Sequence, residues 1–428
     1  MDKKEKLGIC PAFLFYLSLI LKFIVKFLLP PFLFFLTVFS QNSFAQSQLN
    51  VQKMVSFENF INDEIKNLNI AGAEVLVYKN NEIAWHKALG YVNLSTQKPL
   101  EKNSIYYIQS MTKPIISVAI MQLVEKGLID LEDKAQKYIP ELASLRVNLD
   151  LSMGVNGPTE DRESDITIKQ LLTHTAGFSH GLETTQFDQE LFKLMYNDLF
   201  NPKEYRKIEE RIDQLLKVPL IGQPGKQWEY SASPDLLALI LQRISGQGVN
   251  TYLKEFIFEP LGMTETGYNV SPPNANRVML VYLKNEAQEL IPSPYQVPTQ
   301  GNTVYGGTHG LFSSMEDYLR FCKMVLSNGS LNGKSILKPE TIALMEQNHV
   351  GSMLGGARGF GLGFGVLVDT DKDPSPGSDG QIYWGGFFKT HFFIDPAEDL
   401  IAIFMTQKFP SNNEYVIALN RYVYSALE

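Results

Sequence analysis

Strand-like sequence lies near both ends of this 428-residue chain, whereas helical sequence fills its middle. The stretches with strand character are 73–78 and 83–89 near the start, and 365–368, 382–385, 391–394 and 400–405 near the end. Helical stripes flank them at 55–67 and 413–426. The simplest packing is one antiparallel sheet built from both chain ends, flanked by helices, with a mostly helical lobe inserted at roughly 128–300. The sequence therefore predicts an α+β fold whose active cleft lies between sheet and lobe.

The first 45 residues have the composition of a targeting segment. A start with three lysines is followed by a long apolar stretch, of which 27–39 has the length of a signal-peptide core. Ser43 and Ala45 place small residues at the two positions that a signal peptidase reads. We expect 1–45 to be a signal peptide or, against the two lysines that interrupt it, an N-terminal membrane anchor. The body, 46–428, is then exported, periplasmic or secreted, with membrane contact only through an uncleaved leader.

Composition argues against several classes of function. The net charge is −8 and the body has no basic cluster, so binding to nucleic acid has no support. Cys10 and Cys322 are too few for a disulfide framework, and the six histidines show no paired metal spacing. The alternating glycines of 355–365 do not fit a dinucleotide motif and are better suited to close approach between backbones. We therefore expect no nucleic-acid partner, no metal and no cofactor.

A Ser-x-x-Lys pattern opens the predicted helix 111–125. Residues three apart lie on one helix face, so the amine of Lys113 can reach the hydroxyl of Ser110. A serine hydroxyl is a weak nucleophile and needs a base beside it. Burial or neighbouring positive charge lowers the pKa of a lysine enough for it to serve as that base. By itself the pattern is common, and its plain interpretation is a helix cap with a solvated lysine.

Four further segments make the pattern specific. They are Ile-Thr-Ile-Lys-Gln-Leu-Leu-Thr-His-Thr-Ala-Gly at 166–177, Tyr-Ser-Ala-Ser at 230–233, Gly-Gly-Thr-His-Gly-Leu-Phe-Ser-Ser at 306–314 and Tyr-Trp-Gly-Gly at 383–386. In this order they resemble the serine β-lactamase and penicillin-binding protein superfamily, and within it the class C-like branch of peptidases, lactamases, carboxylesterases and acyltransferases. The resemblance extends over essentially the whole mature chain and implies a β-lactamase/transpeptidase-like fold.

The resemblance implies a role for three side chains. Ser110 would be acylated, and Lys113 would share its proton and hold the neighbouring phenol in an active state. Tyr230 would act as the general base, with its phenol deprotonated or nearly so between cations. Together they imply a serine hydrolase that forms an acyl-enzyme on Ser110.

A late strand would complete the site. In lactamases this strand carries Lys-Thr-Gly, and here Trp384, Gly385 and Gly386 would replace it as substrate-binding residues. The backbone N–H groups of Phe387 and Ser110 would then form the oxyanion hole, in which each donor contributes roughly 3 kcal/mol to lowering the barrier.

Lys389-Thr390-His391 looks like a damaged Lys-Thr-Gly, but its spacing is wrong. The motif strand must turn and pair with the strand that ends near Asp395. Asp395 lies eleven positions after Trp384, which is enough for a strand, a turn and a returning strand. It lies only six positions after Lys389, which is too few for a hairpin of normal strand length.

Two departures bear on the substrate. The usual Tyr-x-Asn reads Tyr230-Ser231-Ala232, so the asparagine that binds a substrate amide is missing, and Trp384 stands where a cation would meet a substrate carboxylate. Both changes resemble the esterase members and favour hydrolysis of a small ester or amide. The alternatives are a β-lactamase or D,D-peptidase, and a non-catalytic envelope binding protein of the same fold.

Gly177-Phe178-Ser179-His180-Gly181 matches the nucleophile elbow of α/β-hydrolases, a rival site. That motif needs a strand before it, and the residues before it here have a helical pattern. We interpret His174 as a structural residue and His180, His309 and His391 as structural or rim residues. Among these three we expect His309 to line the cleft.

Overall fold

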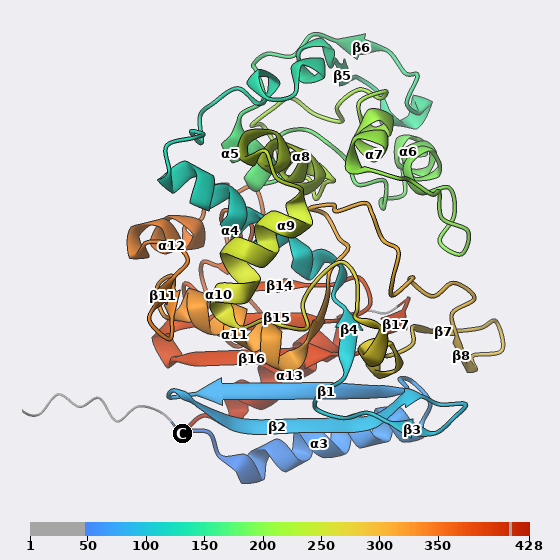
Figure 1. The fold of residues 1–428 in the computed structure, drawn as a ribbon, viewed down its shortest axis with the longest axis vertical. Helices are drawn as coiled ribbons and strands as arrows, with labels where there is room; N and C mark the ends of the chain where they lie inside the picture. Colours follow the sequence, from blue (N-terminus) through green and yellow to red (C-terminus); the bar gives the residue numbers. More distant parts are fainter. Residues whose placement is uncertain (1–47, 411–412) are drawn as a thin grey trace, which may run out of the picture. The chain divides into compact units, whose positions relative to one another are not determined.

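An eight-stranded antiparallel sheet made from both ends of the chain forms the base of the molecule (Figure 1). The computed structural model describes residues 48–410 and 413–428. The strand order is β12-β13-β14-β15-β16-β1-β2-β3. The strands are β1 Gly72–Lys79, β2 Glu82–Asn93, β3 Lys98–Pro99, β12 Arg358–Phe360, β13 Gly365–Leu367, β14 Ile382–Gly385, β15 His391–Asp395 and β16 Leu400–Met405. Because β1 pairs directly with β16, the predicted two-ended sheet and the α+β class are confirmed.

The two central strands are buried on both faces, which their near-continuous apolar sequences require. Alternate residues point to opposite faces, so Val75 and Val77 pack under the terminal helices, whereas Leu76 joins the larger core on the other side. The terminal helices are α3 Val51–Lys66 and α13 Glu414–Ser425, close to the predicted ranges.

Helices of the middle of the chain cover the opposite face of the sheet (Figure 1). They are α4 Thr112–Glu125, α5 Ile168–Leu172, α6 Gln186–Tyr196, α7 Ile208–Leu215, α8 Ser233–Ser245, α9 Val249–Leu253, α10 Glu259–Leu261, α11 Met315–Leu326 and α12 Pro339–Glu346. The helix α4 is buried along nearly its whole length and packs against α8. It therefore lies between the sheet and the helices α5 to α8, where a site at its start faces both.

Short strands outside the main sheet form three two-stranded sheets and one three-stranded sheet in the described part of the chain. They are β4 Ile105–Tyr107 with β9 Phe312–Ser314, β5 Val147–Asn148 with β6 Thr159–Glu160, β10 Ser330–Leu331 with β11 Lys334–Ser335, and β7 Tyr282–Lys284 with β8 Leu290–Pro292 and β17 Lys408–Phe409. The pair β5–β6 encloses a largely polar segment that contains Gly154 and Gly157. Their short ladder forms because residues 147 and 148 pair with 160 and 159 across the glycine-containing turn.

The glycine-rich stretch 355–365 forms β12, a turn and the start of β13. A side chain at Gly361 would overlap the carbonyl oxygen of Met345, so close backbone approach explains this glycine. The expected leader, 1–45, lies outside the described residues. Among the helices that are described, none is both long enough and apolar enough to span a bilayer.

Candidate active site

The hydroxyl of Ser110 is the point where three predicted side chains meet. Ser110 lies in a 3-10 turn, Gln109–Met111, that leads directly into α4, and Lys113 is the second residue of that helix. Tyr230, 120 positions later, precedes α8. The amine Nζ of Lys113 donates to Ser110 Oγ at 3.0 Å, and the phenol of Tyr230 donates to the same oxygen at 2.7 Å. The structure therefore brings both Lys113 and Tyr230 within hydrogen-bond reach of the Ser110 hydroxyl.

Lys113 is held in a place where its neutral form is favoured. Its side chain is 1% exposed. Burial lowers its pKa well below the usual value; Asp235 opposes this shift, and Arg211 adds to it. The amine also donates to the carbonyl oxygen of Thr308 at 2.9 Å and lies 4.6 Å from the ring centre of Tyr230. An amine fixed in this way and easily deprotonated can accept a proton from Ser110.

Tyr230 lies among aromatic rings and is only partly exposed. The rings of His174, His180 and Trp384 lie 5.1, 5.3 and 5.6 Å from its centre. Burial raises the pKa of the phenol, while the contacts with Ser110 and Trp384 lower it in part. This direction favours the protonated phenol in the resting site, whereas the resemblance implies a phenol that is close to deprotonation between cations. Lys113, the cation near the ring in the described part of the chain, is itself driven toward neutrality by burial.

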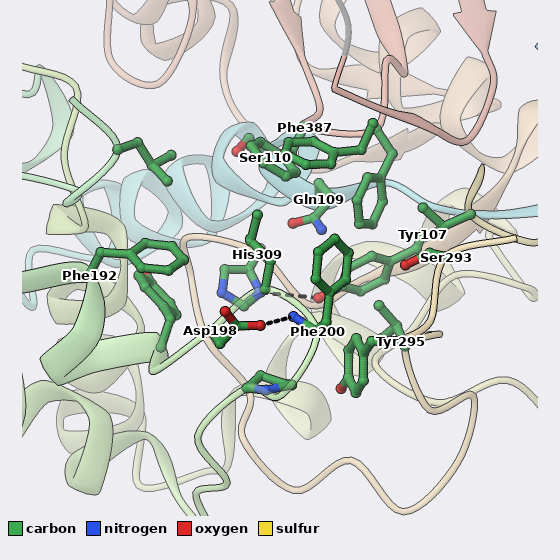
Figure 2. A pocket seen from close by; sticks show the side chains of 18 of the residues that line it. Tyr107, Gln109, Ser110, Phe192, Asp198, Phe200, Ser293, Tyr295, His309 and Phe387 are labelled. Atoms are coloured by element: carbon green, nitrogen blue, oxygen red, sulfur yellow. Dashed lines mark hydrogen bonds between the residues drawn. The ribbon is translucent and has the colours of Figure 1, made fainter. Parts of the chain in front are cut away.

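The end of β14 lies against the turn that carries Ser110. The hydroxyl of Thr390 donates to the carbonyl oxygen of Ile108 at 3.3 Å, and a Cβ on Gly386 would lie only 2.5 Å from that oxygen. Phe387 follows in the turn and lines the same cavity as Ser110, as Figure 2 shows. The structure thus brings the end of β14 and Phe387 next to the turn that carries Ser110.

Lys389-Thr390-His391 does not form a motif strand. Lys389 lies in the turn between β14 and β15 with a φ of 67°, and β15 begins only at His391. The pairing of Gly385 with His391 makes this a tight connection. The spacing argument for Trp384 over Lys389 is therefore confirmed by the strand bounds.

The histidines and the rival serine have structural partners. His174 Nδ1 lies 2.9 Å from the Ser231 hydroxyl, and burial keeps its pKa well below the usual value. Ser179 donates to the Asp188 carboxylate at 2.5 Å and is 4% exposed, with α5 rather than a strand before it. The nucleophile-elbow interpretation is therefore wrong. His180 and His309 both line the cavity beside Ser110.

Sequence reasoning missed a buried ion pair behind the site. Arg211 Nη2 donates to Asp235 Oδ1 at 2.8 Å, and the same oxygen accepts from the backbone N–H of Thr308 at 2.8 Å. Burial alone would raise the pKa of Asp235, but Arg211 holds it below the usual value. The pair thereby fixes Thr308, whose carbonyl holds Lys113. The only signal was Asp235 in the string after Tyr230, since Arg211 lies in a helix with ordinary amphipathic spacing.

An apolar cavity opens beside Ser110, which we call the first cavity (Figure 2). Its volume is about 210 Å³. Five phenylalanines from three parts of the chain line it: Phe192 and Phe200, Phe387 and Phe388, and Phe409. Across residues 48–410 and 413–428, no three His, Cys, Asp or Glu side chains are grouped as metal ligands would be.

This fold is that of the β-lactamase family, and the sequence agrees. Residues 57–425 match the family model Beta-lactamase, so the chain belongs to that family. It is 30% identical to Protein Rv1367c of Mycobacterium tuberculosis over 80% of this chain and 86% of that protein. It is 25% identical to Esterase EstB of Burkholderia gladioli over 80% and 87% of the two chains.

The fold agrees with that of a solved structure. The chain superposes on EstCE1, described as a hydrolase with promiscuous acyltransferase activity, with a TM-score of 0.74. The match covers 87% of this chain and 99% of EstCE1 at 22% identity. The expected β-lactamase/transpeptidase-like fold is therefore confirmed.

Proposed function

We propose that this protein is an esterase-like serine hydrolase that cleaves a small ester through an acyl-enzyme on Ser110. The observation that carries the proposal is the pair of contacts, 3.0 Å from Lys113 and 2.7 Å from Tyr230, that converge on one hydroxyl. Geometry of this kind is what an activated nucleophile requires. The esterase name of EstB supports the same class of reaction.

The first half of the reaction uses Lys113 as the proton acceptor. As Ser110 Oγ attacks the ester carbonyl, its proton moves to the neutral amine of Lys113, whose lowered pKa suits that role. The carbonyl oxygen becomes an anion between the backbone N–H groups of Ser110 and Phe387. Fixed donors at this point stabilise the transition state by roughly 3 kcal/mol each.

The second half releases the alcohol. Tyr230, which holds its proton at rest, donates this proton to the leaving alkoxide. The proton that Lys113 took from Ser110 then passes to Tyr230, so that both groups are neutral again. The C–O bond of the ester breaks, and the acyl group stays on Ser110. Water then attacks the acyl-enzyme with the same groups acting in reverse, which yields the acid and free Ser110.

The residues around Ser110 favour an uncharged ester over a penicillin or a cell-wall peptide. Ala232 is fully buried and carries no amide to bind a substrate side chain. Trp384 stands where a cation would meet a carboxylate, and the first cavity is lined by aromatic rings. An apolar acyl or alkoxy group gains by leaving water for such a surface, by about 25 cal/mol per Å².

Steady-state and burst kinetics with p-nitrophenyl butyrate test the proposal. The parent protein should release one equivalent of nitrophenol rapidly, and Ser110→Ala should lose the burst and nearly all turnover. Ser179→Ala is the matched control, since that serine lies in the rival motif and is bonded to Asp188. Hydrolysis by Ser110→Ala at the parental rate, with the fold intact by circular dichroism, would contradict the proposal.

We also propose that the body is exported. The support is the leader-like composition of 1–45 and the small residues Ser43 and Ala45. Fractionation of the native host followed by N-terminal sequencing tests this. An intact N-terminus on protein recovered from the cytoplasm would contradict it.

A further inference from the structure

A second cavity adjoins the first one, beyond a wall that contains Tyr107, Tyr196 and His309. Its volume is about 520 Å³, and its lining is more polar, with Arg211 and Asn302 among its residues. A substrate that reacts at Ser110 and fills the first cavity therefore meets this wall. What the wall offers to such a substrate follows from its hydrogen bonds.

A chain of hydrogen bonds with a fixed direction ends at the phenol of Tyr107. Arg211 Nη1 lies 3.3 Å from His309 Nε2, and His309 Nδ1 lies 3.1 Å from Tyr107 Oη, the dashed contact in Figure 2. A guanidinium only donates, so Nε2 accepts and Nδ1 carries the proton. Burial and Arg211 keep the pKa of His309 well below its usual value, which agrees with this neutral form. Tyr107 therefore accepts from His309, and its own proton has no acceptor within residues 48–410 and 413–428.

Two more donors on this wall lack acceptors. The phenol oxygen of Tyr196 and the Nε of Arg211 are both buried, and neither has a hydrogen-bond partner in the described part of the chain. Arg211 is only 5% exposed. Buried polar groups in folded proteins are almost always paired, because an unpaired one costs about 1–3 kcal/mol. Tyr107, Tyr196 and Arg211 all line the second cavity, so three donors there lack an acceptor among the described residues. Oδ2 of Asp235, behind Arg211, is a buried acceptor nearby that is also unpaired in the described residues.

We propose that the wall formed by Tyr107, Tyr196 and Arg211 is a subsite that binds an uncharged acceptor oxygen, a carbonyl or hydroxyl, in the part of the ester remote from the scissile bond. This inference rests on the proposed ester hydrolysis at Ser110 and names its substrate more closely. The charge balance selects a neutral group, since Asp235 already neutralises Arg211 at 2.8 Å. The substrate class is an ester with an apolar segment for the first cavity and an oxygen function beyond it.

Three matched p-nitrophenyl esters test the subsite: octanoate, its analogue with a ketone near the chain end, and its analogue with a terminal carboxylate. The parent protein should show kcat/KM about tenfold higher for the keto ester than for octanoate, the effect of one buried hydrogen bond. Tyr196→Phe should bring this ratio close to one. Tyr205→Phe is the control and should keep the ratio, since Tyr205 lines the same cavity but already donates to the Met195 carbonyl at 2.7 Å.

Each other outcome has a definite meaning. Equal rates for octanoate and the keto ester in the parent protein, or an unchanged ratio in Tyr196→Phe, overturn the subsite while ester hydrolysis stands. Preference for the carboxylate analogue overturns the assignment of a neutral group. No hydrolysis of any of the three esters overturns the proposed function and this inference with it. If Tyr196→Phe does not fold, Tyr107→Phe carries the same comparison, because it removes the donor at the end of the chain of bonds.

Discussion

Replacement of Gly386 by alanine should move the end of β14, and with it the backbone N–H of Phe387, away from Ser110. The new Cβ would lie 2.5 Å from the Ile108 carbonyl oxygen and even closer to the Thr390 hydroxyl, whereas ordinary contacts begin near 3.4 Å. The Ile108 backbone and the buried Thr390 side chain leave little room for this Cβ, so the end of β14 must shift by about 1 Å. A misplacement of this size in an active site costs about 10²-fold in rate. We therefore expect the acylation rate to fall about 10²-fold, toward the loss of a whole oxyanion donor.

The assay is the acylation rate with p-nitrophenyl butyrate, measured from the burst by stopped flow. Gly248→Ala is the matched control, because a Cβ there meets nothing within 4 Å. Circular dichroism and the midpoint of thermal unfolding check that both variants fold. The reasoning is refuted if Gly386→Ala acylates as fast as the parent, since Phe387 would then not act on the transition state.

Three further predictions follow from the same geometry. In the parent protein kcat/KM should rise with pH through the lowered pKa of Lys113 and then level off. Between that pKa and about 10.4 the unfolded lysine binds a proton that the folded one does not. Stability should therefore rise with pH in this window, and Lys113→Met should lose both this slope, seen by urea unfolding, and activity. Arg211→Met should lower the free energy of unfolding by about 3–5 kcal/mol by leaving Asp235 buried and unpaired, and Asp235→Asn in the same protein should recover part of it. A fluorescent penicillin should label Ser110 weakly or not at all in gels, and strong labelling would favour the lactamase or peptidase alternative.

The sheet could be predicted because its signal is local. Strands such as β1 and β16 carry apolar runs with β-branched residues, and the bounds observed differ little from those expected. That two segments more than 300 positions apart pair with each other followed from there being strands at both ends, with helices between them. Ser110 and Lys113 were also predictable from three-residue spacing, although the serine lies in a turn before the helix rather than at its first position.

The polar wall behind the site could not be predicted, because its signal arises only on packing. Arg211 has the spacing of an ordinary helix residue and becomes buried when α7 lies beside α8. Tyr107 and Tyr196 come from a strand and a helix far apart in sequence, and neither has a motif around it. The motif around Tyr230 likewise indicates a neighbouring cation but carries no information on burial. Burial raises the pKa of Tyr230 and lowers that of Lys113, and both shifts favour the neutral forms.

The central claim is that one hydroxyl, activated by an amine and a phenol, becomes covalently acylated. Mass spectrometry of the protein quenched during turnover of p-nitrophenyl butyrate tests it most directly. The account predicts one added acyl mass, located by peptide mapping on Ser110 and absent from Ser110→Ala. An acyl mass on a different residue, or steady turnover by a protein that never carries one, would contradict it.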